Sequence, residues 1–222
     1  MTVVQIVSPE VLRTGLRLKR IGTTALLVGL VASTVLVSPW AWWTIAAVII
    51  AIDLSGRILC LQAGIPSRRS IRCSVGAQAS GLACLLISGF IGRSWILAGL
   101  AAAVICQVSA ARWFVDFLQD IAHAIGRPDV SDQIGNLRDR LDVFAGSLYG
   151  AGFSALVIGI VVFFVGLMTW GVGWVIGVPL GGMAIAVVFL ASMALYLRML
   201  FVYRKVLRSV EDAVAAVGTK VD

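Results

Sequence analysis

Residues 143–197 read VFAGSLYGAGFSALVIGIVVFFVGLMTWGVGWVIGVPLGGMAIAVVFLASMALYL, and this stretch contains no charged side chain. Its apolar residues form continuous runs and do not alternate with polar ones, which predicts helices in lipid rather than strands of a membrane barrel. The turn signal Gly171-Val172-Gly173 separates two runs, Val143–Trp170 and Trp174–Leu197. Each run is long enough to cross about 30 Å of hydrocarbon as a helix. We therefore expect a transmembrane hairpin here.

The rest of the chain has the same character. Of its 222 residues, 60% are hydrophobic and 13% are charged, and the mean hydropathy is +1.00, well above that of a soluble domain. Four further apolar runs precede the quoted stretch: Ile21–Val37, Trp40–Leu61, Ser74–Ile91 and Trp95–Ala111. The short breaks at Ser38-Pro39 and Gly92-Arg93-Ser94 indicate tight helical turns. The predicted fold is an all-α integral membrane protein with six transmembrane helices in three antiparallel hairpins.

Charge and tryptophan positions predict the orientation. Of the 18 Lys and Arg residues, only Arg93 lies at one of the three tight turns, and cytoplasmic loops are the ones that carry such an excess of basic residues. The tight turns instead carry an aromatic belt, typical of a membrane–water interface. Its members are Trp40, Trp42, Trp43, Trp95, Trp170 and Trp174. We therefore expect both termini in the cytoplasm and the tight turns outside.

This topology divides the chain into five parts. They are a cytoplasmic amphipathic N-terminal segment (1–20), two transmembrane hairpins (21–111), a cytoplasmic amphipathic helical loop (112–142), a third transmembrane hairpin (143–197) and a cytoplasmic C-terminal helix (198–222).

Hydrophobic residues continue at helical spacing beyond the fourth and sixth apolar runs. Phe114, Phe117 and Ile121 follow the fourth run, and Val206 and Val210 follow the sixth. Two interpretations stay open. These stripes pack on each other or on the membrane surface, or they form a docking surface for a protein partner.

Asp53 is the acidic residue inside a predicted span, and Arg57 follows it by one helical turn, where the two can pair. An ionisable residue inside the membrane is by default a candidate functional site. The alternative is a structural ion pair in which Arg57 extends toward the interface.

Small residues at regular spacing predict close helix packing in the last hairpin. They are Gly146, Gly150, Gly152, Gly159, Gly166, Gly173, Gly177 and Gly181. A homo-oligomer interface or a hinge is the alternative use of the same pattern. Pro179 either bends the start of the sixth helix or breaks it, as in transporters.

The sequence offers little catalytic chemistry. His123 is the single histidine and the four cysteines form no CxxC pair, which excludes a haem held by two histidines and a zinc site with several. We expect no catalytic, cofactor or metal site. The basic residues flank apolar runs rather than forming a groove, so nucleic acid is not an expected partner. The expected partners are the lipid bilayer and either a protein or a second copy, bound through the cytoplasmic helices.

Two short stretches carry a resemblance. Residues 56–60 (GRILC) and 117–128 (FLQDIAHAIGRP) are similar to a group of multi-pass membrane proteins of planctomycete-type bacteria, over about residues 56–130. The resemblance implies a bacterial inner membrane and carries over no activity or site residue. The functional expectation is a non-enzymatic subunit or scaffold. The alternative is a small permease or channel with Asp53 and the glycine-rich last hairpin near its path.

Overall fold

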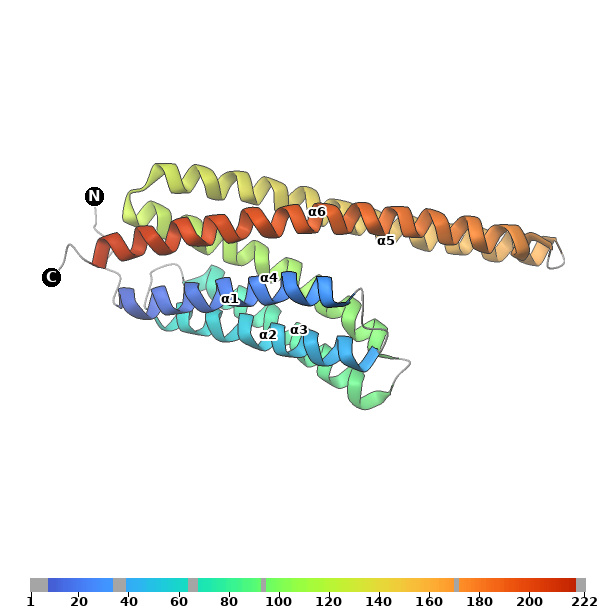
Figure 1. The fold of residues 1–222 in the computed structure, drawn as a ribbon, viewed down its shortest axis with the longest axis horizontal. Coiled ribbons are helices and arrows are strands. Elements are labelled where there is room, and N and C mark those ends of the chain that lie inside the picture. The colour runs from blue at the N-terminus through green and yellow to red at the C-terminus, as the bar shows by residue number, and fades with distance from the viewer. Residues whose placement is uncertain (1–7, 34–38, 64–67, 93–94, 170–171, 219–222) are drawn as a thin grey trace. The chain divides into compact units, whose positions relative to one another are not determined.

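The computed structural model describes residues 8–33, 39–63, 68–92, 95–169 and 172–218, with only the backbone described at some helical positions. All its regular elements in these ranges are helices, with no strand (Figure 1). They are α1 (Pro9–Ser33), α2 (Pro39–Gln62), α3 (Arg68–Ile91), α4 (Ile96–Ile125), α5 (Pro128–Met168) and α6 (Val172–Gly218). The prediction of an all-helical chain is confirmed.

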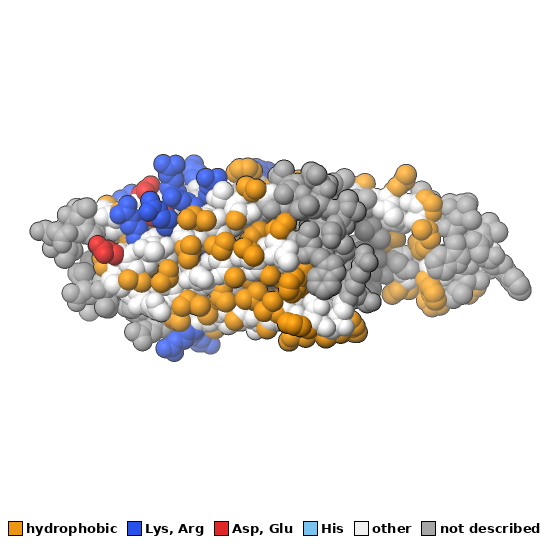
Figure 2. Space-filling model, turned by 60° about the horizontal axis from the view of Figure 1, so that its bottom comes forward, with side chains coloured by type: hydrophobic (Ala, Val, Ile, Leu, Met, Phe, Trp, Pro, Cys, Tyr) orange, Lys and Arg blue, Asp and Glu red, His pale blue; other side chains and the backbone are white. Residues whose placement is uncertain are grey.

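Three described segments are long and apolar enough to cross a membrane: Trp43–Gln62 in α2, Arg69–Ile91 in α3 and Ala101–Ile125 in α4. The other predicted spans lie along α1, α5 and α6, and each includes residues of which the backbone or the side chain lies outside the described part. On the face drawn in Figure 2, Lys and Arg side chains gather in patches apart from a broad field of hydrophobic side chains. This surface suits lipid better than water.

The helix ends follow from local sequence. α1 begins at Pro9, a favoured first helical position. α4 ends where Gly126 adopts φ +71°, a left-handed conformation that glycine takes without strain. Pro128 then starts α5. Of the two alternatives at Pro179, a bend or a break, the break is wrong, because α6 continues through this residue.

α5 and α6 are longer than predicted. α5 joins the expected loop helix and the fifth span into one helix of 41 residues, and α6 joins the sixth span and the C-terminal helix into one of 47 residues. No glycine or proline interrupts residues 136–145 or 183–203. In each case the polar and apolar segments therefore belong to one continuous helix, and only the type of side chain on it changes.

The chain forms two compact units, residues 1–138 with 200–222, and residues 139–199. In the first unit α1 packs on α2, α2 on α3, and α3 on α4. Its main core, here the helix-end core, includes Leu16, Phe114, Ile121, Leu137 and Leu207, all fully buried. The apolar stripes that left two interpretations open therefore pack on each other and on α1.

α1 and α2 touch through their backbones. A Cβ atom placed on Gly15 would lie 2.9 Å from the Gly56 carbonyl oxygen, and one on Gly56 would lie 2.9 Å from the Lys19 nitrogen. Only glycine at both positions allows this approach. The predicted packing glycines did not include this pair.

In the second unit, part of the predicted glycine packing is present. Gly177 and Gly181 face Val162, and a Cβ atom on Gly181 would lie 3.1 Å from its Cγ2 atom. Gly146 and Gly150 have nothing within 4 Å of such an atom. The surroundings of the others lie outside the described part, and these are Gly152, Gly159, Gly166 and Gly173.

The predicted aromatic belt is described at two tryptophans. Trp95 is 58% exposed, as expected of an interfacial residue. Trp43 is instead half-buried, and its Nε1 donates to the Leu85 carbonyl oxygen at 2.7 Å. Gly89 leaves room for its ring, so Trp43 joins α2 to α3. The side chains of Trp40, Trp42, Trp170 and Trp174 lie outside the described part.

The glycine contact makes a direct prediction. Gly15→Ala should destabilise the protein by about 1–3 kcal/mol, because its methyl group would push the α1 and α2 backbones apart. Thermal melting in mild detergent, followed by tryptophan fluorescence, measures this effect. Gly76→Ala in α3 is the matched control, since nothing lies within 4 Å of its Cβ position and alanine favours a helix. Equal melting temperatures for the two variants would contradict the backbone contact.

Candidate functional site: a buried charge cluster

Three charged side chains meet in the interior of the first unit. Lys19 comes from α1, and Asp53 and Arg57 come from α2. Their relative exposures are 2%, 3% and 0%. The Gly15–Gly56 contact brings the two helices close enough for Lys19 to reach across to Asp53. We call these three residues, with Ser74 and Gln107, the Asp53 cluster.

The Asp53 carboxylate is the common acceptor. Its Oδ1 accepts a hydrogen bond from Lys19 Nζ. Its Oδ2 accepts from Arg57 Nε at 3.2 Å, from Arg57 Nη2 at 3.0 Å and from Gln107 Nε2 at 3.4 Å. The predicted neighbours Asp53 and Arg57 are thus in contact, and Lys19 is added from another helix. Charge-assisted and bidentate contacts of this kind are the stronger hydrogen bonds in proteins.

Arg57 extends the cluster to two more helices. Its Nη1 donates to Ser74 Oγ on α3 and to the Ala110 carbonyl oxygen on α4, the latter at 2.5 Å. Ser74 Oγ also donates to the same carbonyl oxygen at 2.8 Å. Arg57 therefore bonds α2 to α3 and α4, and does not extend toward the interface as the structural alternative assumed.

Aromatic rings close one side of the cluster. Lys19 Nζ lies 5.3 Å from the centroid of the Phe114 ring and 5.6 Å from that of Tyr203. The Arg57 guanidinium carbon lies 5.3 Å from the Phe114 centroid. Cation–π contacts are strongest where water is excluded. The rings thus stabilise the cations on the side that the carboxylate does not cover.

The cluster has one acid for two cations, so its formal charge is +1. Removing a charge from water costs several kcal/mol, and pairing repays this only with good geometry. Here each Asp53 oxygen contacts a different cation, and the second cation bonds three helices. The arrangement can hold helices in register, and its excess positive charge can also attract an anion.

Gln107 of the cluster, and Gln78 one helical turn from its member Ser74, have buried hydrogen-bonding atoms without a partner in the described part. Gln78 follows Ser74 by one turn of α3 and is 1% exposed, and neither its oxygen nor its nitrogen has a partner in the described part. The Gln107 oxygen is likewise buried without one. A buried amide without partners costs about 1–3 kcal/mol. A water molecule or a small solute that bonded these atoms would remove this cost.

A second ion pair joins α1 to α6. Glu211, 5% exposed, lies 2.9 Å from Arg20 Nη1 and 3.9 Å from Arg17 Nε. Lys19 and Arg20 are adjacent, so they leave α1 in directions about 100° apart. One faces the Asp53 cluster and the other faces α6.

Sequence reasoning missed Lys19, Ser74, Gln78 and Gln107. Lys19 was assigned to the basic N-terminal segment, whereas it is a buried residue of α1. A signal was present, because polar residues four apart, Ser74 and Gln78, interrupt the third apolar run on one helix face.

The remaining chemistry is sparse in the described ranges. His123 Nε2 lies 3.0 Å from Ser131 Oγ at an exposed position. No group of three His, Cys, Asp or Glu residues there could hold a metal ion. All four cysteines are unpaired. Arg127 donates two hydrogen bonds of 2.9 Å to Asp129 in the turn before α5, and these bonds hold the pKa of the Asp129 carboxyl below its usual value.

No protein-family model, curated protein or solved structure matches this chain. The resemblance of residues 56–60 and 117–128 to planctomycete-type membrane proteins stays a prediction.

The cluster predicts an asymmetry between its members. Asp53→Asn leaves two buried cations without an acid and should destabilise the protein by about 3–5 kcal/mol. Lys19→Met leaves the neutral Asp53–Arg57 pair in place and should cost less than half as much. Thermal melting in mild detergent compares the two variants. Equal losses would show that Asp53 does not hold both cations.

Proposed function

We propose that the chain is a six-span protein of a bacterial inner membrane, folded as three hairpins with both termini in the cytoplasm. At about 1.5 Å per residue, α5 and α6 are about 60 Å and 70 Å long, twice the hydrocarbon thickness of about 30 Å. Each helix must therefore leave the membrane on one side. The basic residues favour the cytoplasm for that side.

Within this topology, we propose a non-enzymatic subunit or scaffold that binds a partner protein at the cytoplasmic face. The helix-end core is the observation that carries the proposal. It joins the first turns of α1, α3 and α5 to the last turns of α2, α4 and α6 through about twenty buried residues. A core of this kind holds these helix ends, and the surface over them, in one fixed arrangement.

The outer surface over this core is charged. Asp132 on α5 and Lys205, Arg208 and Asp212 on α6 are exposed. Because the apolar stripes are buried inside, a partner would be recognised through these charges. Complementary charges of this kind set partner choice and association rate.

The Asp53 cluster supports a structural role beside this function. Its three charges contact one another and its cations face aromatic rings. It holds α1, α2, α3 and α4 together beside the helix-end core, so that the cytoplasmic surface keeps one shape.

Native mass spectrometry of the full chain, extracted gently from its own membrane, tests the scaffold proposal. We expect a second protein at fixed stoichiometry, and we expect Asp132→Lys to release it. Glu10→Lys is the matched control, since it makes the same charge change at an exposed acid of α1 rather than α5. A monomer or homo-oligomer as the sole species would contradict the proposal.

A second function, a small permease, is favoured by one observation, the buried amides of Gln78 and Gln107 beside a cluster of charge +1. A solute with acceptor and donor groups would satisfy both amides, and an anionic group would offset the excess charge. In this case the cluster would be a binding site in the membrane interior, where transporter sites commonly lie.

The permease function predicts a trade-off between stability and transport. Gln78→Leu removes buried atoms without partners, so it should keep or raise the melting temperature. It should also abolish solute-dependent flux in proteoliposomes, assayed with amino acids, nucleosides and small organic anions. Unchanged flux in the variant, or no flux in the unmodified protein, would contradict this function.

A further inference from the structure

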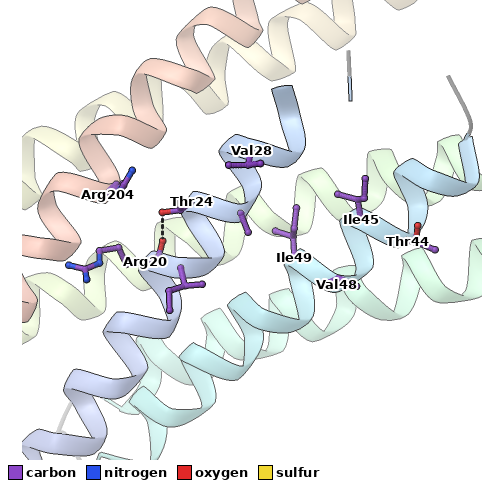
Figure 3. A pocket seen from close by; sticks show the side chains of 10 residues that line it. Arg20, Thr24, Val28, Thr44, Ile45, Val48, Ile49 and Arg204 are labelled. Carbon is purple, nitrogen blue, oxygen red and sulfur yellow. Dashed lines mark hydrogen bonds between the residues drawn. The ribbon is translucent and has the colours of Figure 1, made fainter. Parts of the chain in front are cut away.

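A groove of about 800 Å³ runs along the outside of α1 and α2 in the first unit (Figure 3). Its walls are almost wholly apolar. The apolar lining residues are Ile21, Ala25, Val28, Ile45, Val48 and Ile49. Val28 and Val48 are 63% and 59% exposed. An exposed surface of this kind needs an apolar occupant.

Both threonines in the walls already have interaction partners. Thr24 Oγ1 donates to the Arg20 carbonyl oxygen at 2.9 Å, the dashed line in Figure 3. Thr44 has a partner of its own. Between Thr24 and Thr44 the walls therefore offer a chain-like apolar ligand few polar groups to desolvate.

The groove is basic at one end. Arg20 of α1 and Arg204 of α6 line it there, and Figure 3 shows both on the side away from Thr44. Glu211 contacts Arg20 and Arg17, so these two arginines share one acid. Arg204 is exposed and has no acidic partner in the described ranges. An anion can therefore approach it directly.

An apolar wall with arginines at one end matches an amphiphile, which has an apolar chain and a charged headgroup. From Arg20 to Val28 the apolar wall extends about 12 Å along α1, and it begins at the level of the arginines. The basic end belongs to the side of the chain that carries almost all Lys and Arg residues. Basic pockets at the cytoplasmic ends of membrane helices commonly bind anionic headgroups.

We propose that this groove binds an anionic phospholipid of the inner leaflet, with an acyl chain between α1 and α2 and the phosphate at Arg20 and Arg204. The site rests on the proposed membrane orientation but not on a protein partner.

Native mass spectrometry of the full chain in a neutral detergent tests the site. Phosphatidylglycerol and phosphatidylcholine with identical acyl chains are titrated separately. The first equivalent of phosphatidylglycerol should bind about fivefold more tightly, the preference expected from one arginine near a headgroup. Arg204→Gln should remove this preference. Lys205→Gln, which removes the same charge at the next residue outside the groove, should keep it.

A variant in the wall tests the acyl chain. Val28→Trp fills the groove at an exposed position and should weaken phosphatidylglycerol binding while both arginines remain. Equal affinity for the two lipids in the unmodified protein would overturn the proposal. So would an equal loss in Arg204→Gln and Lys205→Gln, which indicates general surface charge, or full binding by Val28→Trp. These results are separate from the partner measurement, because no second protein is needed.

Discussion

The carboxylate of Asp53 is the contact on which the first unit depends. It is the one acid between two buried cations from two helices, and through Arg57 it reaches two more. Buried charges such as these have no water to solvate them, so any arrangement of the helices that separates them is strongly disfavoured. The glycine contact between α1 and α2 makes this arrangement possible, since a wider helix separation would leave Lys19 short of the carboxylate. Charge and backbone packing thus specify the same register.

The helix-end core places a different constraint on the chain. Side chains of this core contact one another as in a soluble domain, with Phe114, Leu137 and Leu207 fully buried. Close packing of this kind adds many dispersion contacts between the helices, each small and together large. The same continuous helices enter both regions. Apolar packing at the helix ends therefore adds to the small-residue and ionic contacts along their lengths.

The sequence predicted well what depends on local pattern. Helical class, the beginning of α1 at Pro9 and the end of α4 at Gly126 follow from apolar runs, proline and glycine. Asp53 and Arg57 were recognisable because they lie one turn apart on one helix. Lys19 and Gln107 were not, because their approach to Asp53 depends on contacts between residues 34 and 54 positions apart. The continuity of α5 and α6 was missed for another reason: a change from polar to apolar surface was treated as a boundary, although nothing there interrupts the backbone.

The adjacent residues Lys19 and Arg20 connect the interior of the first unit to its surface. Lys19 faces Asp53 and Arg20 faces Glu211, so the rotation of α1 about its own axis is fixed from two directions. Once this rotation is set, Ile21, Ala25 and Val28 must face outward beside α2, because a helix advances by about 100° per residue. The apolar groove and its basic end are therefore consequences of the same ion pairs that hold the interior together. Because Lys19 is buried against Asp53, the direction of its neighbour Arg20 on α1 is determined as well.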